Sequence, residues 1–183
     1  MPVCAETYER VALEDQDSKW ELWDGQLRQK PIMSFQHGYS QRGLAAQLIR
    51  QLPIQEYQVS TDSARTQRLS ASYFVPDVLV IPVSLLKEAL AASPDRLEVY
   101  AAPLPFIAEV WSPSTGEYDV DVKLGEYQRR GDHEIWRVHP PSRSVTIWLR
   151  QPDGGYTEAV HTTGVIELAV LPGVRVNLDQ LCA

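Results

Sequence analysis

Two strongly apolar segments, each carrying a single charged residue, constrain this chain of 183 residues more than any other feature of its sequence. In residues 73–81 the charged residue is Asp77, and in residues 104–111 it is Glu109. Apolar runs of this length predict strands in the interior of a sheet. A carboxylate among buried strand residues is unfavourable unless it is paired, protonated or bound to a metal ion. Both acids are therefore candidates for a functional site.

The rest of the pattern predicts one domain around these two segments. Asp24-Gly25 between two short alternating runs is typical of a hairpin, because both central residues of a type I′ turn need positive φ. No internal repeat or linker divides the sequence, so we expect a single α+β domain over residues 1–183, with residues 1–19 as a candidate N-terminal extension. The predicted helices cover residues 5–15, 34–52, 83–92 and 117–130, and further strands are predicted over 20–23, 26–28, 56–60, 134–138, 144–149 and 156–160, with short pieces around Ile166 and Val174.

The charge balance restricts how such a protein can meet nucleic acid. The 17 Lys and Arg residues against 24 Asp and Glu residues give a net charge of −7, so the overall field repels DNA. Contacts with DNA must then be local, and the candidates for them are Arg42, Arg50, Arg65, Arg68, Arg129 and Arg130.

The sequence carries no signal for a membrane or for export. No run approaches the length of a membrane span, and no basic region followed by an apolar run stands near the start, so we expect a soluble, cytoplasmic protein. Cys4 and Cys182 are expected to be free thiols in such a reducing compartment.

Asp77, Glu109 and Lys123 together can build a metal-dependent phosphodiesterase site. Two carboxylates from neighbouring strands, with a backbone carbonyl such as that of Val110, offer the hard oxygen ligands that Mg²⁺ or Mn²⁺ prefers. A lysine beside them can orient the attacking water and offset negative charge in the transition state. The residues alone leave an alternative open, in which Asp77 caps a strand end, Glu109 pairs with an arginine and Lys123 bridges Asp119 on an exposed helix face.

A collinear set of motifs then resembles a known family. The set consists of Glu21-Leu-Trp-Asp-Gly25, Ser34 with His37, Pro76-Asp77-Val78, Glu109-Val-Trp-Ser-Pro-Ser-Thr115, Asp119, Lys123, Tyr127, Gly131 and Glu134-Ile-Trp136. In order and spacing it is similar to the Uma family of restriction-endonuclease-like proteins, a branch of the PD-(D/E)XK nuclease superfamily. The resemblance implies a restriction-endonuclease-like core, with a mixed central sheet flanked by helices, an N-terminal β-hairpin and extra C-terminal strands.

The same resemblance implies a function and roles for individual residues. The expected activity is a Mg²⁺- or Mn²⁺-dependent endonuclease acting on DNA, with Asp77 in the PD position, Glu109 as the following acid and Val110 completing the metal ligands. Trp111 stands where the superfamily pattern has a lysine, so the catalytic lysine role passes to Lys123 on the next helix. The resemblance adds further catalytic candidates, namely Glu21, Asp119 and His37.

Alternatives to these roles remain open from the sequence. Glu21 is equally well explained as a structural residue of the hairpin, and a lone histidine at a helix start, such as His37, is more often a capping or surface group. The chain as a whole has a second reading as a catalytically inactive nuclease-fold module for binding or regulation, favoured by the net charge and by Trp111. A homodimer is an expectation by analogy with nucleases that cut both strands.

Overall fold

The computed structural model describes residues 2–15, 17–68, 72–113 and 116–182, and confirms the predicted α+β class. Its helices are α1 (Ala5–Glu14), α2 (Phe35–Ile49), α3 (Val83–Ala92) and α4 (Gly116–Arg130). Its strands are β1 (Trp20–Trp23), β2 (Gln26–Gln29), β3 (Tyr57–Ser60), β4 (Arg65–Arg68), β5 (Ser72–Phe74), β6 (Val78–Pro82), β7 (Val99–Tyr100), β8 (Phe106–Val110), β9 (Glu134–His139), β10 (Ser144–Arg150), β11 (Tyr156–His161), β12 (Val165–Glu167) and β13 (Arg175–Asn177).

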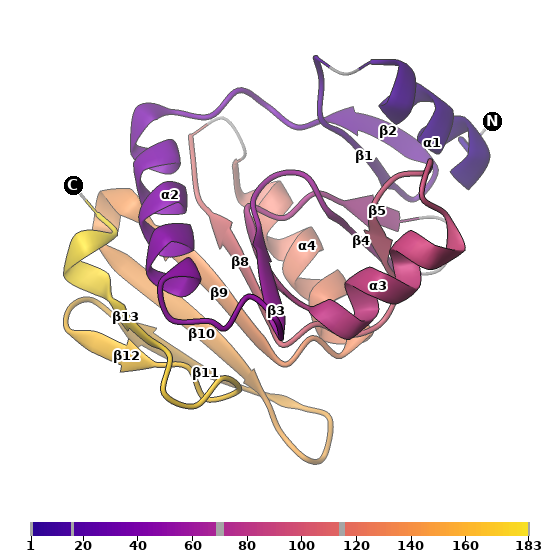
Figure 1. Cartoon of the computed structure of the whole chain (residues 1–183). Helices are drawn as coiled ribbons and strands as arrows, with labels where there is room; N and C mark the ends of the chain where they lie inside the picture. The colour runs from indigo at the N-terminus through magenta and orange to yellow at the C-terminus, as the bar shows by residue number, and fades with distance from the viewer. Residues whose placement is uncertain (1, 16, 69–71, 114–115, 183) are drawn as a thin grey trace.

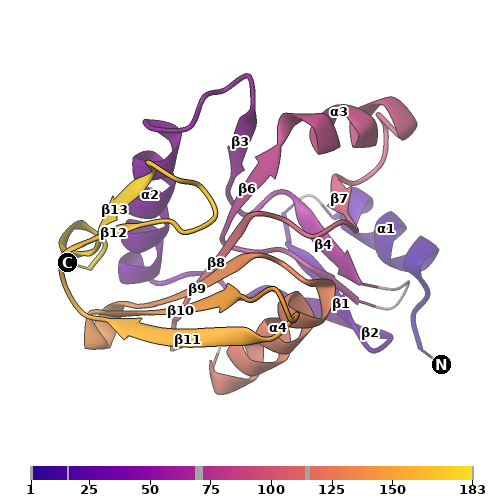
Figure 2. The same ribbon diagram turned by 90° about the horizontal axis from the view of Figure 1, so that it is seen from below.

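The largest sheet is mixed, as the resemblance implied. Its strand order is β11-β10-β9-β8-β6-β3, and the pair β8–β9 is parallel while the other neighbours are antiparallel. Helix α2 packs Leu44 and Leu48 into the apolar cluster on one face. Helix α4 packs Tyr127 into the cluster on the other face, so the sheet lies between the two helices (Figures 1 and 2). The C-terminal hairpin β12–β13 lies beside α2.

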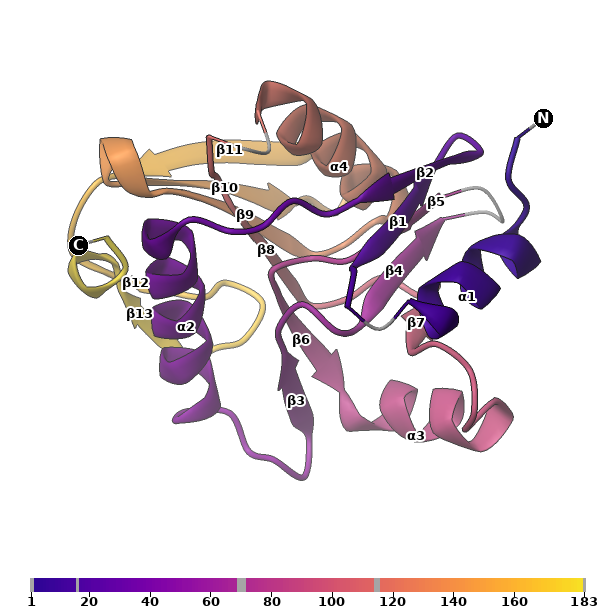
Figure 3. The same cartoon turned by 90° about the horizontal axis from the view of Figure 1, so that it is seen from above.

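A second sheet was not foreseen from the sequence. It has the order β2-β1-β5-β4-β7 and carries α1 on its outer side, as the view from above shows (Figure 3). The predicted continuous strand over residues 73–81 is wrong, because β5 belongs to this sheet and β6 to the larger one. Pro76 lies between them and has no amide hydrogen to donate to a ladder. Asp77 therefore lies in the connection just before β6.

Local signals placed several elements correctly. Asp24 and Gly25 have φ values of 46° and 73°, as a type I′ turn requires. Ser34 caps α2 by accepting a hydrogen bond from the amide of His37 at 3.2 Å. Gly131 ends α4 with φ of 83°. Among the described residues, no helix is long and apolar enough to cross a membrane.

Candidate active site

Asp77 and Glu109 face each other at one end of the pair β6–β8. In this antiparallel register Val78 is opposite Ala108, so the residue before Val78 and the residue after Ala108 form the next opposed pair. The Asp77 side chain is 1% exposed and that of Glu109 is 14% exposed. The sequence prediction that these two acids meet is consistent with this geometry.

Asp77 is held by three donors that the protein itself supplies. Its Oδ1 accepts a hydrogen bond from Nζ of Lys30 at 2.6 Å, and its Oδ2 accepts from the amide of Val110 at 2.6 Å. Nε2 of His37 lies 2.9 Å from the same Oδ2. Burial alone would raise the pKa of Asp77, but the Lys30 ammonium and the hydrogen bond from His37 hold it well below the usual value. Asp77 is therefore a carboxylate in the folded protein.

Lys123 lies on the other side of the acid pair and joins three segments of the chain. Its Nζ is 2.8 Å from Oε1 of Glu21 and 3.5 Å from Oε1 of Glu109. Glu21 also accepts a hydrogen bond from the amide of Val75 at 2.8 Å, and the hydroxyl of Tyr127 donates to Glu109 at 2.5 Å. The alternative in which Lys123 lies on an exposed helix face is wrong, because its side chain is only 3% exposed.

The surroundings of Glu109 disfavour its charged form. Burial and the negative charge of Asp77 raise its pKa to about 8, although the ammonium groups of Lys123 and Lys30 act in the opposite direction. Burial and the neighbouring Glu109 likewise raise the pKa of Tyr127 well above its usual value, which keeps its hydroxyl proton available for donation. The alternative in which Glu109 pairs with an arginine is wrong, since its ion-pair partner is Lys123.

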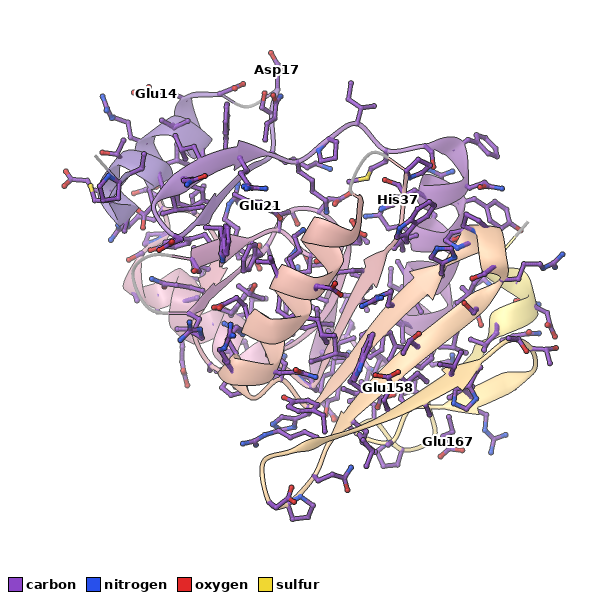
Figure 4. The ribbon with its side chains drawn as sticks, turned by 180° about the vertical axis from the view of Figure 1, so that it is seen from behind. Glu14, Asp17, Glu21, His37, Glu158 and Glu167 are labelled. Atoms are coloured by element: carbon purple, nitrogen blue, oxygen red, sulfur yellow. The ribbon has the colours of Figure 1, made fainter. Side chains whose placement is uncertain are left out.

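Glu21 and His37 come from two different elements of the N-terminal third of the chain, β1 and α2. Figure 4 shows Glu21 on the hairpin and His37 on α2, whereas Glu158 and Glu167 lie on the C-terminal strands. His37 is fully buried, so the reading of it as a surface residue is wrong. Its Nδ1 is buried and has no hydrogen-bond partner among the described residues. The side chain of Asp119 lies outside the part of the chain whose side chains the structure describes.

A second polar cluster adjoins Asp77 and was missed by sequence reasoning. Lys30 contacts Asp62 at 2.7 Å as well as Asp77, and Gln41 donates to the second oxygen of Asp62 at 2.7 Å. Lys19 contacts that same oxygen at 3.0 Å. The one available signal was composition, because lysine occurs only at positions 19, 30, 87 and 123. A cavity of about 520 Å³ borders the cluster and is lined in part by Lys19, Lys30 and Asp62.

Two arginines near the site differ in whether protein groups already pair their guanidinium. Arg130, predicted as a phosphate contact, is instead buried against Asp132 and the carbonyl oxygens of residues 67 and 100–102. Arg137 was not singled out from the sequence, yet it is the partner of Glu109 in the β8–β9 register. Its Nε is buried with no hydrogen-bond partner among the described residues, and its nearest ion-pair distance is 3.5 Å to Asp121.

The acid pair offers some, but not all, of what a hard divalent cation needs. The described residues contain no group of three or more His, Cys, Asp or Glu side chains placed to hold a metal ion. Asp77 and Glu109 nevertheless suit such an ion chemically, because a buried carboxylate and a 14% exposed one stand at opposed positions of the β6–β8 register. The described contacts of Glu109 are all at Oε1, which leaves Oε2 for a ligand. Water must then supply most of the coordination.

Comparisons with known proteins bear on the fold and the family. The Uma2 family model, described as "Putative restriction endonuclease", matches residues 5–179. The fold is similar to that in the crystal structure of a "putative nuclease belonging to DUF820" from Anabaena variabilis, with a TM-score of 0.77 and 15% sequence identity. That match covers 98% of this chain and 97% of the other chain, and at this identity the likeness concerns the fold alone. No curated protein matches the sequence.

Proposed function

Because the chain belongs to the Uma2 family of restriction-endonuclease-like proteins, we propose that it is an endonuclease that hydrolyses DNA phosphodiester bonds with the help of a divalent cation. The observation that carries the proposal is the buried Asp77 opposite the part-buried Glu109, with a buried lysine, Lys123, on the side of Glu109. Acids and an ammonium within one small volume suit chemistry on a phosphodiester, which develops negative charge in the transition state.

Asp77 and Glu109 are the residues that would hold Mg²⁺ or Mn²⁺. A cation bound there supplies Lewis acidity toward the scissile phosphate and activates a water molecule. Val110 supports the site in the structure through its amide, which fixes Oδ2 of Asp77, and its carbonyl is the proposed backbone ligand. Trp111, at the usual lysine position, stacks against His139 with ring centroids 4.5 Å apart and so leaves the lysine role to another residue.

Lys123 is proposed to orient the attacking water and to offset charge on the phosphate. Glu21 holds its Nζ at 2.8 Å and is itself fixed by the amide of Val75, so the hairpin positions the lysine toward Glu109. Asp119, one turn earlier on α4, keeps its proposed role of steering the same ammonium. His37 is proposed to orient Asp77, and its unpartnered Nδ1 can accept a hydrogen bond from water or substrate.

DNA is the proposed substrate, and contacts with it must be local because the net charge is −7. Arg137 is the strongest phosphate contact that the geometry offers, because it neighbours Glu109 and its guanidinium is incompletely paired. We expect the enzyme to act in the cytoplasm, and as a homodimer where both strands are cut.

A second candidate function is a non-catalytic binding module. The observation in its favour is that protein donors already contact both oxygens of Asp77. A nuclease must keep at least one of these oxygens accessible to a cation, whereas a binding module need not.

The first experiment is cleavage of supercoiled plasmid and single-stranded DNA in Mg²⁺, Mn²⁺ or EDTA. The informative variants are Glu109→Gln and Lys123→Met. Their matched controls are Glu167→Gln on β12 and Lys87→Met on α3, which remove an acid and a lysine exposed far from the acid pair. Each protein is purified in the same way, so that a contaminating nuclease appears equally in all of them.

We expect metal-dependent cleavage by the wild type and by both controls, and its loss in Glu109→Gln and Lys123→Met. Equal cleavage by all five proteins would assign the activity to a contaminant. Absence of cleavage under every condition, with DNA binding retained, would favour the binding module.

A further inference from the structure

Lys30 is a buried ammonium with a complete set of acceptors. Its side chain is 2% exposed, and Nζ donates to Asp62 at 2.7 Å, to the carbonyl of Val75 at 2.8 Å and to Asp77 at 2.6 Å. An ammonium has three protons, so these contacts use all of its donors. All three contacts are with acceptors and two of them are carboxylates, so Lys30 is held here as an ammonium.

The surrounding structure prevents Lys30 from moving away. The amide of Lys30 donates to the carbonyl of Lys19 at 2.7 Å. This bond ties the residue after β2 to the residue before β1, across the hairpin. Gln41 bridges the two acids that Lys30 contacts, since its amide donates to Asp62 and to the carbonyl of Asp77. The ammonium is thus held between Asp62 and Asp77 by contacts on several elements.

The acceptor capacity of Asp77 then limits what else it can bind. A carboxylate offers about four lone-pair sites. Lys30, His37 and the Val110 amide occupy three of them. A carboxylate that bridges two cations, as in two-metal sites, must give a separate oxygen to each. Asp77 has room for one further bond and cannot bridge.

We propose that Lys30 takes the place of a second metal ion, so that the site binds a single divalent cation of the Mg²⁺ class. The inference rests on the proposed metal-dependent function and adds the number of ions and the residue that sets it. Lys30 neutralises Asp62 and one oxygen of Asp77, and Glu109, whose described contacts are all at Oε1, supplies Oε2 to the single ion. Lys30 acts here as a positioning residue, since its protons are used within the protein.

The test is a titration with Mn²⁺ alone, followed by isothermal calorimetry and by the electron paramagnetic resonance signal of free Mn²⁺. The wild type is expected to bind one ion, and Glu109→Gln is expected to lose it. In Lys30→Met, which keeps the length of the side chain without its charge, we expect a second ion to bind. The bordering cavity of about 520 Å³ gives that ion a route to Asp62.

Lys19→Met is the matched control. Lys19 contacts the same Asp62 at 3.0 Å, yet its side chain is 48% exposed and its ion-pair contact is with Asp62 rather than Asp77. We expect this variant to bind one ion with unchanged affinity. Because Lys30→Met removes the ammonium that contacts both Asp62 and Asp77, Lys30→Met with Asp62→Asn provides a charge-balanced second variant. Circular dichroism checks that each protein is folded, and in the double variant we expect at least tenfold tighter binding of Mn²⁺.

Two ions in the wild type would overturn the inference. Unchanged number and affinity in the folded Lys30 variants would overturn it while leaving the proposed function intact. If neither the wild type nor the variants bound Mn²⁺, the inference and the proposed metal-dependent function would both be overturned. The plasmid assay would identify this case separately, because cleavage would then not depend on the metal.

Discussion

The ion pair between Glu21 and Lys123 allows a stability prediction worked directly from the structure. Their charged atoms are 2.8 Å apart, and the side chains are 5% and 3% exposed. Two unit charges at this separation attract by about 6 kcal/mol at an effective dielectric constant of about 20. The cost of taking both groups out of water cancels a large part of that attraction. We therefore expect a net coupling of about 3 kcal/mol between them.

Removing one partner leaves the other buried with too few compensating contacts. We expect Glu21→Gln and Lys123→Met each to lower the free energy of unfolding by about 3 kcal/mol. The double variant should lose about 3 kcal/mol in total rather than 6, because neither charge is left alone. It should also remain inactive on DNA, because the proposed catalytic ammonium is absent.

Urea denaturation of the four proteins of this double-mutant cycle measures the coupling, provided that the dependence on denaturant is the same for all four. The exposed pair Glu167 and Arg175, with side chains 46% and 66% exposed, provides a control cycle in which no coupling should be measurable. Losses in the two single variants of the buried pair that simply add in the double, to within about 0.5 kcal/mol, would refute the reasoning.

Three further predictions concern the turn, the helix cap and the DNA contact. Gly25→Ala should lower the unfolding free energy by about 1–2 kcal/mol in urea denaturation, because φ is 73° and a Cβ atom would lie 2.3 Å from that of Pro2; unchanged stability would contradict this. Ser34→Ala should lower the unfolding free energy by about 1 kcal/mol in the same assay, since it removes the cap of α2, and Ser34→Asp should retain it. Arg137→Gln should weaken binding of a DNA duplex in fluorescence anisotropy and reduce the salt slope by about 1, whereas the exposed Arg129→Gln should not; equal effects would argue against a specific phosphate contact.

Much of the fold follows from short stretches of sequence. The hairpin at Asp24-Gly25, the start of α2 at Ser34 and the end of α4 at Gly131 depend on backbone preferences of one or two residues, so local reading predicts them. Strand β4 escaped prediction because its sequence, Arg-Thr-Gln-Arg, has no apolar alternation. Its pairing with β5 and β7 depends on segments brought together by the rest of the fold.

The site divides in the same way. An acid within each apolar segment identified Asp77 and Glu109 from the sequence, since an isolated charge in a core strand needs an explanation. The partners of those acids could be assigned only from the tertiary structure, because Lys30 lies 47 residues from Asp77 along the chain. Local preferences act over a few residues, whereas an ion pair forms wherever packing places two charges within reach. The sequence by itself therefore determined which residues need compensation, and the packing of the hairpin and α4 against the sheet decided that Lys30 and Lys123 provide it.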